Sequence, residues 1–415
     1  MGHDMCRFSI TPQTARDIAW LEAAHARLGR RGVVPRRWAG RLKRELQAGA
    51  IAASSRMEGV RVDADETRRI LAGDRPASVT AGDAALVEGY RDAVAYALAE
   101  ATRPEFAWSQ RLILDVHRIA MAASTHANAG TFRPGPVSVV DGAGIVIYSA
   151  PMAVLVPEIV DGLCQWLSTA NDLPAPVVAA LVHAQVAGIH PFSDGNGRTA
   201  RILATLAMVR GGYGTPEFTS LEEWWGSHPR SYYGAFASLG AEWTPGADVT
   251  RFIATHVRAQ RRQVARLTER LAIEREVWAA LEDIVAEDVG LPPRATEALF
   301  DAFLGRTVTN RYYRGVVGAS VATATNDLAA LETAGLLTAS GAGRGRPIQE
   351  RSGLSRWSPA LRTPPYWRLR RPRWTNTGPW CWRTCGSRWA GEDDYHCGSS
   401  ELHSAMPNPA TWCMG

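Results

Sequence analysis

The chain has 415 residues, of which 46% are hydrophobic, and a formal net charge of +5. This length suits two or three domains that each bury a core. No run of about 18 apolar residues occurs, and the N-terminal segment MGHDMCRFSI lacks the apolar stretch of a secretory signal, which excludes membrane-spanning and secreted classes and favours a cytoplasmic protein. The net charge does not indicate a nucleic-acid-binding surface, because residues 351–415 hold nine Arg and four acidic residues and residues 1–350 are formally neutral.

Taken from the N-terminus, the chain is mainly helical, with apolar residues at i, i+3, i+4 and i+7. Four segments carry this pattern: 14–29, 85–101, 109–124 and 154–170. Between the last two, residues 131–151 alternate β-branched residues about the turn Asp141-Gly142, which predicts a short β-hairpin. Residues 175–192, APVVAALVHAQVAGIHPF, predict a buried central helix in which His183 is a core histidine with a hydrogen-bond partner.

The central helix leads into residues 190–201, HPFSDGNGRTAR. Pro191 ends the helix. The glycine-rich turn 195–197 then opens a second helix, predicted over 198–209. Backbone N–H groups of such a turn at a helix N-terminus bind anions, so the segment predicts an anion site.

Four side chains around this turn carry chemistry. Arg198 and Arg201 are three apart, so they share one helix face and can grip a polyphosphate bidentately. Asp194 can hold a Mg²⁺ ion that bridges phosphates. His190 titrates near neutrality and can take a proton from an incoming hydroxyl. The set predicts nucleotidyl or phosphoryl transfer.

The same twelve residues match the signature HPFx(D/E)GNGRxxR at every fixed position, so the chain resembles the Fic family. The resemblance implies a mainly α fold, with a Fic-type helical bundle core and the hairpin 131–151 as a flap over the site. It also implies AMPylation, the transfer of AMP from ATP to a Ser, Thr or Tyr hydroxyl of a target protein. ATP is then the substrate and Mg²⁺ the metal cofactor.

The resemblance assigns roles to matching positions. His190 is the expected general base, Asp194 the expected Mg²⁺ ligand, and Arg201 the expected γ-phosphate contact. Nucleotide contacts are expected from the anion turn, the helix that follows, the flap and a downstream tyrosine: Gly195, Asn196, Gly197, Arg198, Thr199, Arg201, Val139, Val140, Asp141, Gly142 and Tyr232. An Asn that the family often uses near adenine is replaced here by Gly240, which leaves the adenine contacts unassigned.

A second motif lies upstream. Residues 54–59, SSRMEG, fit the inhibitory pattern (S/T)xxxE(G/N) of one Fic class, with Ser54, Glu58 and Gly59 at its fixed positions. A Glu58 carboxylate beside Arg201 would form a charge-assisted pair and occupy the arginine of the γ-phosphate. The α-phosphate would then be misplaced for in-line attack. In some relatives the same Glu helps remove AMP from the target, so a de-AMPylating activity stays open.

The C-terminal part predicts a helical linker, 251–290, and a winged-helix-like domain, 291–350. DNA binding is the more specific interpretation of this domain. However, residues 294–350 hold six Arg and five acidic residues, a weak charge for tracking phosphates. A helical interaction or dimerisation module is the alternative.

Residues 351–415 have an unusual composition, with seven of the 15 Trp and four of the six Cys. We interpret them as a disordered or shifted-frame tail. The rival interpretations are a tryptophan-rich binding tail and a zinc site formed by Cys381, Cys385, His396 and Cys397, whose spacing is weak.

The expected domains follow from these segments: an N-terminal helical region with the inhibitory motif (1–105), the Fic core (106–250), the linker (251–290), the winged-helix-like domain (291–350) and the tail (351–415). The expected function is an autoinhibited protein adenylyltransferase acting on an unidentified target protein, with self-modification and a homodimer left open. The alternatives are a Doc-like phosphotransferase, against which the intact Gly-Asn-Gly argues, and a winged-helix DNA-binding regulator with a nucleotide-sensing core.

Overall fold

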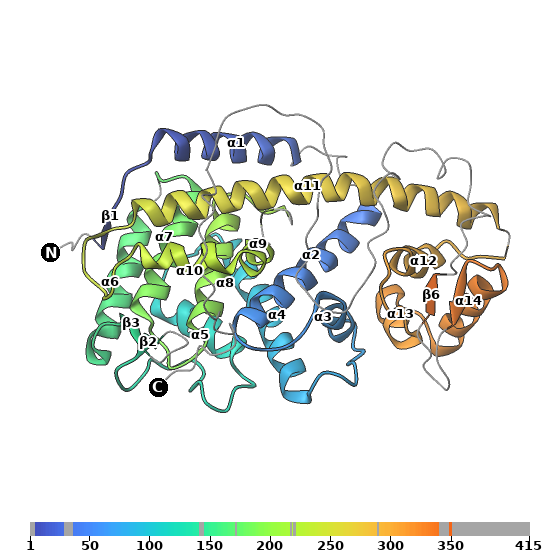
Figure 1. Ribbon diagram of the computed structural model, residues 1–415, viewed down its shortest axis with the longest axis horizontal. Helices are drawn as coiled ribbons and strands as arrows, with labels where there is room; N and C mark the ends of the chain where they lie inside the picture. Colours follow the sequence, from blue (N-terminus) through green and yellow to red (C-terminus); the bar gives the residue numbers. More distant parts are fainter. Residues whose placement is uncertain are drawn as a thin grey trace, which may run out of the picture.

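The computed structural model describes residues 5–28, 36–140, 145–170, 172–215, 218, 221–288, 290–339 and 348–350. Within these ranges it is mainly helical, with fourteen α-helices, one short 3₁₀ helix and three two-stranded sheets (Figure 1). None of the helices in these ranges is both long and apolar enough to cross a lipid bilayer. The mainly α fold that the sequence predicts is confirmed.

The centre of the helical bundle is α7 (Ala175–Ile189), which packs against α8 (Asn196–Arg210). Nearly all of α7 is buried, because its sequence is apolar on every face. The adjoining helices are α4 (Ala81–Ala101), α5 (Gln110–Ala120), α6 (Val156–Thr169), α9 (Leu221–Ser227) and α10 (Pro229–Ala237). Side-chain caps fix the starts of two of them, since Thr80 accepts from the backbone of Asp83 and Ser109 from that of Leu112.

The predicted hairpin is present beside the end of α7. Strands β2 (Ser138–Val140) and β3 (Val146–Ser149) pair antiparallel, with Val139 opposite Tyr148. The Tyr148 hydroxyl donates to the Gly188 carbonyl at 2.8 Å, which anchors the hairpin to α7. Asp141 and Gly142 lie outside the described residues. The short helix η1 (Ala153–Leu155) then leads into α6.

The predicted linker is part of one continuous helix, α11 (Thr250–Glu287), which is 38 residues long. Figure 1 shows α11 running from the bundle to the C-terminal helices, with α1 (Pro12–Leu28) alongside its first half. Strand β1 (Cys6–Arg7) pairs in parallel with β4 (Ala247–Asp248) just before α11. The helix therefore serves two cores, since Val257 and Val264 belong to the bundle and Leu267 and Leu281 to the second core.

The second core lies in the C-terminal domain. Its elements are α12 (Ala295–Phe303), α13 (Asn310–Val317), α14 (Val321–Thr333), β5 (Leu337–Ala339) and β6 (Ile348–Glu350). Three helices followed by an antiparallel pair is the order of a winged helix. The predicted wing tip and the tail 351–415, with its proposed zinc residues, lie outside the described residues.

Helix α2 (Arg36–Met57) joins the two cores. Leu42 and Leu46 belong to the second core, whereas Ile51 belongs to the bundle. The next helix, α3 (Ala64–Leu71), begins at a capping box formed by Asp63 and Glu66. The segment 54–59, which the sequence predicts to be inhibitory, thus lies at the end of a helix whose first half packs in the second core.

Candidate active site

The candidate site is the turn between α7 and α8. His190 caps the C-terminus of α7 in the left-handed conformation, with φ 51° and ψ 59°. Gly195, with φ 77°, precedes the first residue of α8. A histidine with positive φ is strained and persists only where its surroundings hold it. A Cβ at Gly195 would lie 2.6 Å from the sulfur of Met121, so glycine is required there on two counts.

The imidazole of His190 has a defined tautomer. Its Nδ1 lies 3.1 Å from the Ala187 carbonyl, and since a carbonyl only accepts, Nδ1 carries the proton and Nε2 is the basic nitrogen. Burial lowers the pKa of His190 and the Arg133 charge adds to this, although the bond to Ala187 and the charges of Glu58 and Asp194 act in the opposite sense. The ring is therefore neutral near pH 7 and can accept a proton at Nε2.

Two buried side chains close the turn from inside. The Asn196 amide accepts from the Phe192 N–H at 2.9 Å and donates to the Phe192 carbonyl at 2.8 Å. The Thr199 hydroxyl donates to the Gly195 carbonyl at 2.9 Å. Both side chains thus use their hydrogen bonds on the backbone of the turn rather than on a ligand. What residues 196–198 offer to a ligand is their backbone N–H groups, which as the first groups of α8 have no partner within the helix.

Two charged side chains flank these N–H groups. Arg198 is buried, and its Nε has no hydrogen-bond partner within the described part of the chain. Its nearest charge is Asp194 Oδ2, 3.9 Å from Nη2. An unpaired buried donor beside unpaired amides is a site that an anion would satisfy.

Asp194 is the residue that the sequence assigns to Mg²⁺. Its Oδ1 accepts from the Gly195 N–H at 2.6 Å, and its side chain is 30% exposed. The described residues contain no group of three or more acidic, His or Cys side chains that could hold a metal by themselves. A single accessible carboxylate fits Mg²⁺, which binds through one or two carboxylates together with substrate phosphates and water.

Arg201 is held by three protein side chains. Its Nε donates to the Ser54 hydroxyl at 3.0 Å, its Nη1 to the Tyr232 hydroxyl at 3.1 Å and its Nη2 to Glu58 Oε1 at 2.7 Å. The Arg201 side chain is only 2% exposed. Ser54 in the last turn of α2 and Glu58 just after its end thus meet the same arginine of α8.

The Glu58 carboxylate lies over the start of α8. A Cβ at Gly197 would be 2.4 Å from Glu58 Oε1, so the glycine leaves room for the carboxylate. Gly59, with φ 83°, ends α2 and lets the chain turn away after Glu58. Burial alone would raise the pKa of Glu58, but the charges of Arg201 and Arg198 outweigh it and the pKa is lowered. The carboxylate is therefore ionised near pH 7.

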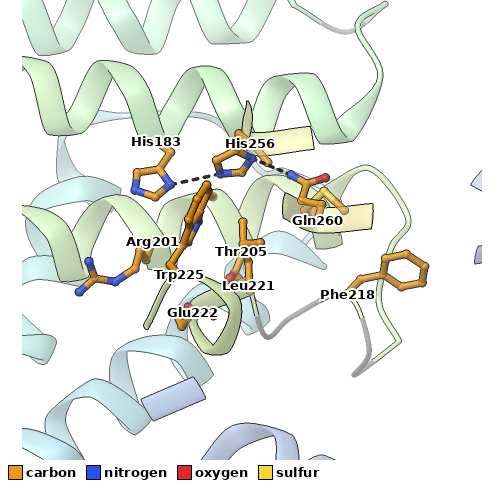
Figure 2. Close-up of a pocket in the computed structure, with 12 residues that line it drawn as sticks. His183, Arg201, Thr205, Phe218, Leu221, Glu222, Trp225, His256 and Gln260 are labelled. Atoms are coloured by element: carbon orange, nitrogen blue, oxygen red, sulfur yellow. Dashed lines mark hydrogen bonds between the residues drawn. The ribbon is translucent and has the colours of Figure 1, made fainter. Parts of the chain in front are cut away.

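Behind Arg201 a buried polar chain continues to α11 (Figure 2). Figure 2 shows two of its links: His183 Nδ1 lies 3.2 Å from His256 Nε2, and His256 Nδ1 lies 2.9 Å from the Gln260 amide. On the side of Arg201, the Tyr232 hydroxyl lies 3.3 Å from His183 Nε2. Burial lowers the pKa of His183 well below its usual value and that of His256 to about 3. Both rings are neutral hydrogen-bond partners, as predicted for His183. Tyr232, which the sequence assigns to the nucleotide, contacts Arg201 and this chain.

Two further residues hold the turn and were not predicted. His117 of α5 stacks on Phe192 with ring centroids 3.6 Å apart. Its Nε2 donates to the Asp194 carbonyl and its Nδ1 accepts from the Gly130 N–H, both at 2.9 Å. Arg133 donates to the His190 carbonyl at 2.8 Å. The bonds from His117 and Arg133 to the turn span 77 and 57 residues, so no local pattern could have found them. Of the predicted flap residues, Val139 and Val140 lie in β2.

Comparison with known proteins supports the assignment of the core. Residues 107–208 match the model of the Fic/DOC family. Over 103 residues the chain is 35% identical to the protein adenylyltransferase fic-1 of Caenorhabditis briggsae and 35% identical to the protein adenylyltransferase Fic of Drosophila willistoni. These matches cover 24% of this chain and 19% and 20% of those proteins, so the chain spans about a fifth of the length of these curated relatives.

Solved structures match over a longer stretch. A Fic family protein from Desulfovibrio desulfuricans G20 superposes with a TM-score of 0.55 at 19% identity, covering 84% of this chain and 98% of that one. A Fic domain containing signaling protein from Bacteroides thetaiotaomicron gives a TM-score of 0.52 at 20% identity, covering 60% of this chain and 95% of that one. These likenesses establish a shared fold. The chain therefore contains a Fic/DOC family domain, with distant similarity to protein adenylyltransferases.

Proposed function

We propose that the protein is an adenylyltransferase that transfers AMP from ATP to a hydroxyl of a target protein and is held inactive by Glu58. The observation that carries this proposal is the contact of Glu58 with Arg201 at 2.7 Å, directly over Gly197 and beside the unpaired amides of α8. An anion-binding turn with an internal carboxylate seated on one of its arginines is the arrangement of a polyphosphate site kept closed.

In the proposed reaction, His190 Nε2 takes the proton of the target hydroxyl. The hydroxyl oxygen forms a bond to the α-phosphorus, the bond from that phosphorus to the bridging oxygen breaks, and pyrophosphate leaves. The N–H groups of residues 196–198 and the free Nε of Arg198 stabilise the phosphate charge. Mg²⁺ held by Asp194 would neutralise charge on the phosphates and help to orient them.

Inhibition follows from competition for Arg201. With Glu58 in place, three protein groups already accept from the guanidinium and one of them is a carboxylate, so a γ-phosphate would have to compete with Glu58 for it. ATP bound without that contact would present its α-phosphate out of line with the attacking hydroxyl. Removal of Glu58 frees the arginine. Whether Glu58 also supports de-AMPylation is a separate activity that the same variants would measure.

The flap is proposed to receive the target. Ile145, Val146 and Ile147 of the flap are 63%, 54% and 43% exposed, which suits an extended peptide laid along β3. The C-terminal domain is proposed to be an interaction module. Helix α14, at the recognition-helix position, has Asp327 and Glu332 and no Lys or Arg, so it lacks the charge for tracking DNA phosphates.

The test is labelling of the Glu58→Gly protein with ATP carrying ³²P at either the α or the γ position, in the presence of Mg²⁺. We expect label on protein from the α position only, and its loss when His190→Ala is added. Label from the γ position would instead identify a phosphotransferase of the Doc type. A specific DNA shift, with no label from either position in a folded protein, would favour the regulator.

A further inference from the structure

Arg133 occupies an unusual position between the flap and the catalytic turn. Its Nε donates to the His190 carbonyl at 2.8 Å and its Nη1 to the Gly135 carbonyl at 2.6 Å, while its Nη2 donates to the Pro151 carbonyl. The Arg133 N–H also donates to the Pro191 carbonyl at 2.9 Å. One side chain thus bonds to both ends of the flap segment and to the residue that we propose as general base.

These bonds explain how His190 keeps its strained backbone. A non-glycine residue at φ 51° needs an external partner to hold it. The His190 carbonyl accepts no hydrogen bond from a further turn of α7, because the helix ends at Ile189. Arg133 supplies the missing donor.

The charge of Arg133 is not neutralised locally. The residue is 3% exposed, and the three partners of its guanidinium are neutral backbone carbonyls. Among the described residues no carboxylate lies within salt-bridge distance of it, so its positive charge acts on the neighbouring imidazole. The other charged groups that act on the ring are Glu58 from the end of α2 and Asp194 from the turn, and both favour the protonated ring.

We propose that Arg133 is a positioning residue for His190. It holds the backbone of His190 in the left-handed conformation and, through its unneutralised charge, keeps the imidazole free of a second proton. The same bonds fix the flap relative to the base, so target and base share one anchor. The kinetic part of this proposal rests on the proposed function, whereas the titration of the ring does not.

Two variants separate the two effects. Arg133→Gln removes the charge and keeps a side chain that can donate a hydrogen bond, whereas Arg133→Lys keeps the charge and loses the planar fork. The readout is the titration of the His190 ring by NMR, assigned by its absence in His190→Gln and measured without nucleotide. In parallel, kcat and KM for label transfer are followed from pH 5 to 9 in the Glu58→Gly background. Arg118→Gln is the matched control, because Arg118 lies in the same region and its side chain is 58% exposed.

We expect the ring to titrate at higher pH in Arg133→Gln, with the acid limb of kcat moving in the same direction. In Arg133→Lys we expect an unchanged titration and a fall in kcat on the order of tenfold to a hundredfold at every pH, with little change in KM for ATP. The control should alter neither. A titration unchanged in the Gln variant, or a Lys variant with the parent kcat, would overturn the proposal.

Failures of the two proposals can be told apart. If the Gln variant does not fold, the Lys variant still tests positioning through kcat. If no variant transfers label, the proposed function fails, and the ring titration in Arg133→Gln still decides whether Arg133 controls His190.

Discussion

Two glutamates, Glu45 in the first half of α2 and Glu58 just after its end, each form an ion pair with an arginine, but the groups around the two pairs differ. At the first half, Glu45 pairs with Arg306 Nη2 at 2.6 Å, and Arg306 Nη1 also lies 2.9 Å from Asp301. At the other end, Glu58 pairs with Arg201 at 2.7 Å. The Glu45 and Glu58 side chains are 9% and 18% exposed, so both pairs are largely shielded from water.

The neighbours of each pair make the difference. Around Arg306, the protein supplies two carboxylates within a core that includes Leu42 and Leu46. Around Glu58, the first backbone donors of α8 have no partner within the helix, and the Nε of Arg198 has none among the described residues. We therefore expect the pair of Glu45 and Arg306 to stabilise the fold. The pair of Glu58 and Arg201 can instead be displaced by an anion, because hydrogen-bond donors beside it remain available to such a ligand.

The largest effect should come from breaking the pair in the second core. Arg306→Ala removes the cation that pairs with Glu45, whereas Asp301 keeps Arg68 at 3.4 Å. Removing one partner of a buried pair typically costs about 3–5 kcal/mol of unfolding free energy. Urea unfolding measures the change. Arg103→Ala is the control, because the Arg103 side chain is 57% exposed in its pair with Glu100, and exposed pairs contribute about 0–1 kcal/mol. Equal losses for both variants would contradict the comparison.

Breaking the pair at the active-site end should change activity more than stability. Glu58→Gly frees Arg201 for the γ-phosphate, and a charge-assisted hydrogen bond of about 1.5–3 kcal/mol corresponds to a gain in labelling rate of roughly 10- to 100-fold. Initial rates with α-³²P-ATP measure the gain. Glu105→Gly, at a side chain that is 74% exposed, should leave the rate unchanged. A Glu58 variant no faster than the parent would show that the contact does not limit the reaction.

Acid should loosen the catalytic turn before the C-terminal domain. Burial lowers the pKa of His117 from its usual 6.5 to about 4, so the unfolded chain binds more protons than the folded one between these values. Stability is therefore lost as the pH falls from 7 toward 4, by about 2 kcal/mol at pH 5. The sequence has no His between residues 257 and 350.

Hydrogen exchange at pH 7 and pH 5, corrected for intrinsic rates, measures this difference. We expect protection to fall in 117–130 and 190–201 more than in 295–333. His117→Gln should reduce the pH dependence of the first two segments. Equal loss of protection in the C-terminal segment would contradict this account.

The smallest expected effect is that of pH on inhibition by Glu58, which should not change between pH 6 and 8. The pKa of Glu58 is lowered by Arg201 and Arg198 against the opposing effect of burial, so the stability of the contact is fully present above the ordinary carboxyl range and is lost only as the pH falls through the lowered value. The ratio of labelling rates of Glu58→Gly and parent should therefore stay constant from pH 6 to 8. A ratio that shrinks toward pH 6 would mean that Glu58 takes up a proton there.

The sequence predicted which residues gather at the site better than it predicted the contacts that hold them in place. Residues 190–201 are contiguous, so their types and spacing alone indicate a base, an anion turn and two arginines. The hairpin and the central helix follow from periodicity for the same reason, because both are local patterns. The motif at 54–59 is short, so it could be interpreted only because the same chain contains the motif at 190–201. In the structure, Glu58 lies 2.7 Å from Arg201.

The supporting contacts are long-range and could not be predicted. Arg133 and His117 bind backbone atoms 57 and 77 residues away, and no local spacing encodes such partners. The inward direction of the Asn196 side chain was likewise hidden, since a turn sequence does not specify which of its polar groups the fold consumes. The shared core of α2 and the C-terminal domain depends on tertiary packing alone.

The most direct test of the central claim, that Glu58 occupies the place of the γ-phosphate at Arg201, is a binding measurement. ATP and ADP are titrated calorimetrically into His190→Ala protein with and without Glu58→Gly, so that no chemistry intervenes. We predict that loss of Glu58 tightens ATP on the order of tenfold or more and leaves ADP nearly unchanged, because only ATP carries the competing phosphate. An equal gain for both nucleotides, or none for ATP, would contradict the claim.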